Sequence, residues 1–354
     1  MYARIPLTLS EVRVAPDLAT PAGWLPVVFM ALMGVALFLY VVLDGYDLGV
    51  GILLPAATTE EKDIMVSSIG PFWDANETWL VLGIGLLLVA FPLAHGVVLS
   101  SLYMPVVLML IGLILRGVAF DFRVKARAAH KPLWNRLFWA GSLLAAGAQG
   151  FMLGSYITGF GTSWAARGFA LLTMICVPAV YALLGAGWLV IKTSGALQLK
   201  AVHWARRFWW GALAGFAAVS VASPLVSERI FEKWFALPFV VLLAPLPLAT
   251  LALLLVSARS LARLPVRLAQ GNEYGAWVPF GCIIGVIAIG FYGLSYSLFP
   301  YLVVDRITIW DAASAPESLF IILAGALLVL PAILGYTVFV YRVFRGKARP
   351  LSYG

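Results

Sequence analysis

Long apolar runs separated by short polar connections fill the chain from about residue 24 to about residue 341. An apolar run bounded by charged residues or by Pro and Gly indicates a membrane span. A helix needs roughly 20 apolar residues to cross the hydrocarbon core, and most of these runs reach that length. We therefore predict an all-α polytopic membrane protein with about nine transmembrane helices, at residues 24–43, 67–91, 96–118, 136–158, 168–191, 208–226, 235–257, 275–299 and 318–341.

The second of these spans depends on where the helix before Pro92 begins. Counted from Thr78, the stretch that ends at Pro92 is too short to cross the membrane. Extending it back to about Ser67 gives a full crossing. That choice brings two carboxylates, Asp74 and Glu77, into the membrane zone.

Composition excludes a soluble protein of this size. Hydrophobic residues make up 62% of the 354 positions and charged residues 11%, against about 45–50% and about 25% in soluble domains. The net charge of +8 would suit a nucleic-acid binder, but the basic residues lie in short runs between apolar segments. We therefore expect no nucleic-acid partner. Cys176 and Cys282 lie inside apolar runs without metal-ligand spacing, so we expect them to be packing residues.

The distribution of basic residues predicts the orientation. Lys and Arg collect in the connections 119–135, 192–207 and 258–274 and in the tail, whereas the alternate connections 159–167, 227–234 and 300–317 are balanced or acidic. The positive-inside rule then places the basic set in the cytoplasm and the amino terminus outside. We expect a cytoplasmic loop from Thr58 to Ser67. The expected division is a retained amino-terminal periplasmic tail at 1–23, a transmembrane helical domain at 24–345 and a cytoplasmic tail at 346–354.

Asp44 and Asp47 close the first span, within a glycine-rich stretch that runs to Gly51. They share a face if the helix continues through them. One interpretation makes them solvated loop residues and lets the glycines end the helix. The other packs them against further helices, because the sequence stays apolar through Pro55, and then requires a counter-charge or a proton. The most economical partner is Arg116, at the same end of the third span.

Asp74 and Glu77 form a second acidic group with the same spacing. Two carboxylates close together in low dielectric should not both be ionised near neutral pH, so one would carry a transferable proton. The alternative is a helix that starts at Ala75, with Asp74 as its N-cap and Glu77 completing a capping box.

The remaining polar positions suggest structural roles. Asp311 precedes the last span, where Pro316 opens a helix well, and we expect it to be a helix cap. A haem usually takes an axial His, Met or Cys within a helical bundle. None of the three histidines, His95, His130 and His203, is expected at mid-membrane depth, because the first lies in the predicted turn between spans two and three and the others in basic loops. We expect no redox centre in this chain.

Four segments in register resemble one membrane-protein family over essentially the whole chain. They are Asp44–Gly51, Ser68–Leu80, Leu113–Arg123 and Thr308–Ser314. In this order and spacing they are similar to subunit II of the cytochrome bd quinol oxidases.

The resemblance implies a haem-free subunit of nine helices, arranged as two four-helix bundles plus one peripheral helix. It implies a partner, subunit I, that holds two b-type haems, one d-type haem and the quinol site. The complex would oxidise quinol and reduce O2 to water by four electrons in the bacterial inner membrane, with proton uptake from the cytoplasm. A small accessory subunit, a structural quinone and a bound lipid are all compatible with the resemblance.

Residue by residue, the resemblance matches Asp74 to the family carboxylate that is proposed to admit cytoplasmic protons. Glu77 occupies a place where the family has Glu or Gln, so no obligatory proton role follows for it. Asp47 and Arg116 match a polar cluster that a carboxyl-terminal tyrosine, aligned with Tyr353, completes. The alternative function is a secondary transporter that uses its carboxylates as coupling-ion sites, with discontinuous helices and inverted repeats.

Overall fold

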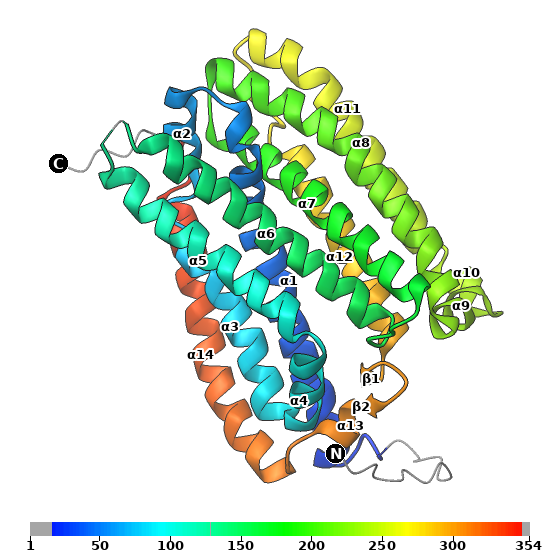
Figure 1. The fold of residues 1–354 in the computed structure, drawn as a ribbon. Helices are drawn as coiled ribbons and strands as arrows, with labels where there is room; N and C mark the ends of the chain where they lie inside the picture. The colour runs from blue at the N-terminus through cyan, green and yellow to red at the C-terminus, as the bar shows by residue number, and fades with distance from the viewer. Residues whose placement is uncertain (1–15, 128, 349–354) are drawn as a thin grey trace.

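The computed structural model describes residues 16–127 and 129–348, most of them helical (Figure 1). The long helices are α1 (Pro21–Leu53), α3 (Trp73–Ala90), α5 (Tyr103–Lys125), α6 (Lys131–Ile157), α7 (Trp164–Lys192), α8 (Gly195–Val226), α11 (Pro245–Ala269), α12 (Val278–Leu298) and α14 (Pro316–Val343). The shorter elements are η1 (Leu54–Ala56), α2 (Thr59–Ile69), α4 (Pro92–Ser101), α9 (Glu228–Phe235), α10 (Phe239–Leu243), β1 (Tyr301–Val303), β2 (Ile307–Thr308) and α13 (Ile309–Ala312). Within the described residues, nine helical stretches are long and apolar enough to cross a membrane. The predicted all-α membrane fold is confirmed, and the expected grouping into two bundles stays a prediction.

Several helices extend beyond the predicted spans. α8 begins at Gly195 rather than at 208, and α11 ends at Ala269 rather than at 257. An apolar run reports only the part of a helix that meets hydrocarbon, and the hydrogen-bonded ladder continues past it into the polar zone. Many residues of the predicted basic loops therefore lie on helix ends.

The first span was predicted to end at 43, but α1 continues to Leu53, so its glycines do not end the helix. Asp44 and Asp47 lie inside this helix and are fully buried. A Cβ on Gly49 would lie 1.8 Å from the carbonyl oxygen of Tyr181, so glycine lets α1 and α7 touch backbone to backbone. The helix continues because this close packing outweighs the low helix propensity of glycine.

The second and third spans are each interrupted. Instead of one helix from Ser67, the chain forms α2, turns through 70–72 and restarts as α3. The predicted loop at 58–67 is helical because Thr58 and Glu61 form a capping box. The expected turn around His95 is also helical: α4 contains this histidine and meets α5 at Leu102.

The connection before α14 contains a short antiparallel pair, β1 with β2, which the sequence reading missed. It leads directly into the four-residue helix α13. The indole nitrogen of Trp310 donates to the carbonyl of Gly23 at 2.9 Å, which ties this connection to the start of α1. The hairpin and α13 lie at one end of the molecule, and α2 lies at the opposite end (Figure 1).

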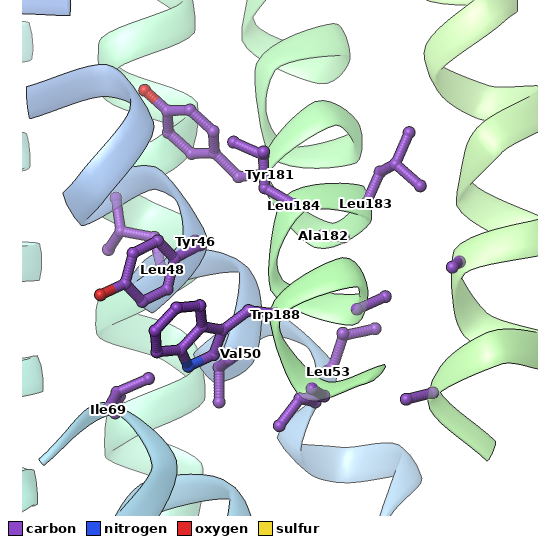
Figure 2. Packing of buried hydrophobic residues seen from close by; sticks show 14 of the residues in the cluster. Tyr46, Leu48, Val50, Leu53, Ile69, Tyr181, Ala182, Leu183, Leu184 and Trp188 are labelled. Atoms are coloured by element: carbon purple, nitrogen blue, oxygen red, sulfur yellow. The ribbon is translucent and has the colours of Figure 1, made fainter. Parts of the chain in front are cut away.

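The core is built around α1, which packs against α3, α6 and α7. Figure 2 shows Tyr46 of α1 against Trp188 of α7, and their rings stack with centroids 4.2 Å apart. By contrast α14 is mostly exposed and is attached mainly near its ends, through Leu319 and Val340. In a bilayer such a surface faces lipid or another subunit.

Candidate functional site

A buried ion-paired group joins three helices near the α2 end of the molecule. Arg116 Nη1 of α5 donates to Asp44 Oδ1 of α1 at 2.6 Å, and its Nη2 donates to Glu77 Oε2 of α3 at 3.1 Å. The side chains of Asp44 and Arg116 are 0% and 1% exposed, whereas Glu77 is 28% exposed. Arg116 also lies 5.8 Å from the ring centroid of Trp73. The guanidinium therefore connects one enclosed carboxylate to one that reaches the surface.

A close helix crossing places Arg116. A Cβ on Gly141 of α6 would lie 2.5 Å from the carbonyl oxygen of Gly112 and 2.8 Å from the amide nitrogen of Arg116. Only glycine allows α5 and α6 to approach this closely. The crossing fixes the backbone from which Arg116 reaches α1 and α3.

Asp47 belongs to a neutral hydrogen-bonded ring beside the ion pairs. Asn76 Nδ2 donates to Asp47 Oδ2 and to the Tyr46 hydroxyl, both at 2.8 Å. The hydroxyls of Tyr46 and Tyr341 are 2.5 Å apart, and Tyr341 also donates to Asn76 Oδ1 at 3.1 Å. Residues from α1, α3 and α14 thus meet around one carboxyl group.

A second chain of polar side chains reaches Asp44 from the other side. Tyr181 of α7 donates to Gln149 Oε1 at 2.7 Å, and Gln149 Nε2 of α6 donates to the Tyr40 hydroxyl at 2.7 Å. Tyr40 precedes Asp44 by four residues on α1 and interacts with it. The polar network therefore extends one helical turn deeper than the ion pairs.

Asp74 lies at the surface, in the first turn of α3. The alternative helix start at Ala75 is wrong, because α3 begins at Trp73 with Phe72 as its N-cap and without a side-chain cap. In the described part of the chain, Asp74 makes no ion pair or hydrogen bond. Asp74 and Glu77 stand one turn apart and interact, so they lead from the exposed end of α3 toward Arg116.

The expected cap, Asp311, is part of a capping box on α13 rather than a cap on the last span. Its carboxylate accepts from the Thr308 amide at 3.2 Å and from the Thr308 hydroxyl at 2.7 Å. α14 has Ala315 as its N-cap, without a side-chain bond, and begins with Pro316. The expectation that Asp311 caps the last span is therefore wrong.

Of the predicted cluster, the structure joins Arg116 to Asp44 and Glu77 and leaves Asp47 to Asn76. Tyr353 lies outside the described residues. The sequence reading missed Asn76, Tyr341, Tyr40, Gln149 and Tyr181. All five are polar residues in apolar stretches, a signal that a search limited to charged residues overlooks.

The residues present do not fit a haem within this chain. His203 and His130 are exposed, and His95 lies half-buried in α4 at the hairpin end. His203 Nδ1 is also in hydrogen-bond contact with the carbonyl of Leu199 at 2.8 Å. Among residues 16–127 and 129–348, no group of three or more His, Cys, Asp or Glu side chains is placed to hold a metal ion. The chemistry available at this site is proton binding and transfer.

Sequence comparison gives one family. The profile of cytochrome bd terminal oxidase subunit II matches residues 25–344. Cytochrome bd ubiquinol oxidase subunit 2 of Bacillus subtilis is 27% identical and aligns over 88% of this chain and 94% of that protein. Cytochrome bd-I ubiquinol oxidase subunit 2 of Escherichia coli K12 is 25% identical over 90% of this chain and 94% of its own length.

Structural comparison gives the same fold. The chain superposes on the bd oxidase from Geobacillus thermodenitrificans with a TM-score of 0.71 and 16% identity. The match covers 91% of this chain and 98% of the other. At this identity the likeness concerns the fold alone.

Proposed function

The chain belongs to the cytochrome bd terminal oxidase subunit II family, and from this membership we propose that it is the haem-free, proton-admitting half of a quinol oxidase in a bacterial inner membrane. A partner, subunit I, holds the haems and the quinol site. The complex oxidises quinol and reduces O2 to water, and the partner consumes the protons that enter through this chain.

The observation that carries the proposal is the graded exposure of the acids on α3. Asp74 is exposed, Glu77 is partly covered, and Arg116 beyond them is buried. A carboxylate at the surface exchanges protons with water, and a neighbour one turn away receives them within reach of a protein interior. Asp74 is the entry group in this arrangement, and Arg116 holds Glu77 in place.

The surface around Asp74 is suited to a partner subunit. Asp74 shares a face of α3 with Val81 and Leu88, which are 71% and 50% exposed. On the same flank of the molecule α5 exposes Ile114 and α14 exposes Leu328 (Figure 1). The opposite flank, with α8 and α11, is also apolar, but the Asp74 acids open on the first. We place subunit I against α3, α5 and α14, and lipid against α8 and α11.

The charge around Asp74 supports a cytoplasmic position for this end. Arg123 pairs with Asp63 at 2.7 Å and Lys200 pairs with Glu61 at 2.8 Å. These pairs tie α5 and α8 to α2, whose end of the molecule carries the basic clusters. Under the positive-inside rule this end faces the cytoplasm, which is where protons for O2 reduction are taken up.

The test is oxygen consumption by the purified two-subunit complex. Asp74→Asn keeps the shape of the side chain and removes its proton, so we expect quinol-driven O2 consumption per haem to fall by roughly a hundredfold. The visible haem spectrum should stay unchanged. Asp121→Asn, an exposed aspartate on α5 at the same end, is the matched control and should keep the full rate. Full activity of Asp74→Asn would remove the proposed role, and a colourless, solitary chain would remove the oxidase function itself.

A further inference from the structure

The buried cluster contains more acid than base. Asp44, Asp47 and Glu77 supply three carboxyl groups, against the single guanidinium of Arg116. The other polar groups facing Asp47 are neutral: Tyr46 from α1, Asn76 from α3 and Tyr341 from α14. Three ionised carboxylates would leave two negative charges uncompensated in a membrane-embedded site, which is strongly unfavourable.

The nearest further cation is engaged elsewhere. Lys192 of α7 donates to the carbonyls of Phe344 and Gly346. Its ammonium lies 5.1 Å from the ring centroid of Phe72 and 5.0 Å from that of Trp188. It forms none of the ion pairs recorded among the described residues, so it does not neutralise the acids on α1.

Asp44 is surrounded by groups that stabilise a negative charge. Arg116 contacts it at 2.6 Å. In the chain Tyr181 to Gln149 to Tyr40, each donor points toward Asp44, and the Tyr40 hydroxyl accepts from Gln149 and so keeps its own proton for a further acceptor. A carboxylate at the end of a row of aligned donors, beside a guanidinium, remains ionised.

Asp47 has no such support. Its recorded hydrogen bond comes from a neutral amide, Asn76 Nδ2, at 2.8 Å. Its other oxygen, Oδ1, is buried and has no hydrogen-bond partner among the described residues. The two ion pairs of Arg116 are formed with Asp44 and Glu77. An ionised oxygen left unpaired at full burial is far more costly than a neutral carboxyl group in the same place.

We propose that Asp47 is an internal proton-binding site, protonated while Asp44 remains the permanent anion of Arg116. The site takes a proton and no other ligand, and its neutral carboxyl group completes the ring formed by Tyr46, Asn76 and Tyr341. The proposal concerns the resting charge of the cluster and does not depend on proton entry at Asp74, so either can fail while the other stands.

Matched amide substitutions test this difference in the whole complex. An amide resembles a protonated carboxyl group, so Asp47→Asn should assemble with a yield close to that of the wild type. Asp44→Asn leaves Arg116 without its buried anion and should lower the yield several-fold. The opposite pattern, poor assembly of Asp47→Asn with normal assembly of Asp44→Asn, would overturn the proposal.

Infrared spectroscopy reads the proton directly. The wild-type complex above neutral pH should show the carbonyl stretch of a protonated carboxylic acid. Asp47→Asn should lose it, and Asp63→Asn, which removes an ion-paired surface carboxylate, should retain it. If Asp47→Asn does not assemble, Asn76→Val keeps both aspartates, removes the hydrogen bond to Asp47 and should shift the band. A band unchanged in Asp47→Asn, or unshifted in Asn76→Val, contradicts the assignment.

Discussion

The tripeptide Trp-Asp-Ala occurs at both ends of the molecule, at 73–75 and at 310–312. In both places it lies at the start of a helix, α3 in the first case and α13 in the second. Asp311 is bonded to Thr308 within a capping box, whereas Asp74 lies exposed without a hydrogen bond in the described chain. The same three residues therefore serve a structural role in one place and leave a carboxylate open to water in the other.

The residue three positions earlier explains the difference. Thr308 offers both an amide and a hydroxyl to Asp311. The equivalent position before Asp74 is Pro71, which has no amide hydrogen and no side-chain donor. A capping box cannot form there. A short motif thus acquires its role from its neighbours.

Removing Arg116 should have the largest effect on this comparison. Arg116→Leu leaves Asp44 buried without a counter-charge, which costs about 3–5 kcal/mol when one partner of a buried pair is lost. We expect little or no assembled complex by size-exclusion chromatography. The control is Arg229→Leu at the hairpin end, because Arg229 pairs with a largely exposed partner, Asp305, and should cost at most about 1 kcal/mol. Normal yields of Arg116→Leu would contradict the ion-paired role.

A smaller loss is expected at the helix crossing that positions Arg116. Gly141→Ala would place a Cβ within 2.8 Å of backbone atoms of α5, an overpacking that costs roughly 1–3 kcal/mol. The thermal midpoint of the complex should fall. Gly168→Ala, on α7, has open space around its Cβ and should be neutral or slightly stabilising. Equal midpoints for the two variants would show that the crossing tolerates a side chain.

Asp311→Ala should cost less again. The substitution removes half of the capping box on α13, typically worth about 1 kcal/mol. The thermal midpoint should drop by a few degrees, and O2 consumption per haem should be unchanged. A lower turnover in this variant would mean that the hairpin end also takes part in proton transfer, which would end the contrast with Asp74.

The smallest effect concerns α2. The hydrogen bond from Lys200 lowers the pKa of Glu61. A carboxyl group whose pKa is lower in the folded state stabilises the protein above its unfolded pKa, near 4.3, and this contribution is lost as the pH falls through the folded value. Lys200→Met should therefore reduce stability by about 0.2–1 kcal/mol at neutral pH. Thermal unfolding below pH 4 should bring the variant and the wild type together, and a gap that persists there would contradict the linkage.

The sequence predicted the number of spans and the buried acids, because uninterrupted apolar runs and the rarity of intramembrane charge are strong signals. It underestimated α1, because Gly49 favours a helix end locally and only its contact with Tyr181 shows why the helix continues. The loop predicted at 58–67 is an example of a readable signal overlooked, since Thr58 and Glu61 have capping-box spacing.

Within the site, sequence reasoning proposed Arg116 as a partner for the acids but could not divide it among them. That division depends on how α5 crosses α6 at Gly141, which no local pattern encodes. The neutral members Asn76 and Gln149 carry no charge and stood out from their apolar stretches only once their partners were known. Their roles, like those of Asp74 and Asp47, stay predictions.

Proton uptake during a single turnover tests the account most directly. The fully reduced complex, reconstituted in vesicles, is mixed with O2, and proton uptake is followed with a pH-sensitive dye on the side that exposes α2. We predict that Asp74→Asn slows this uptake by roughly a hundredfold, while Asp311→Asn matches the wild type. Uptake at the wild-type rate in Asp74→Asn would contradict the claim that this carboxylate admits the protons.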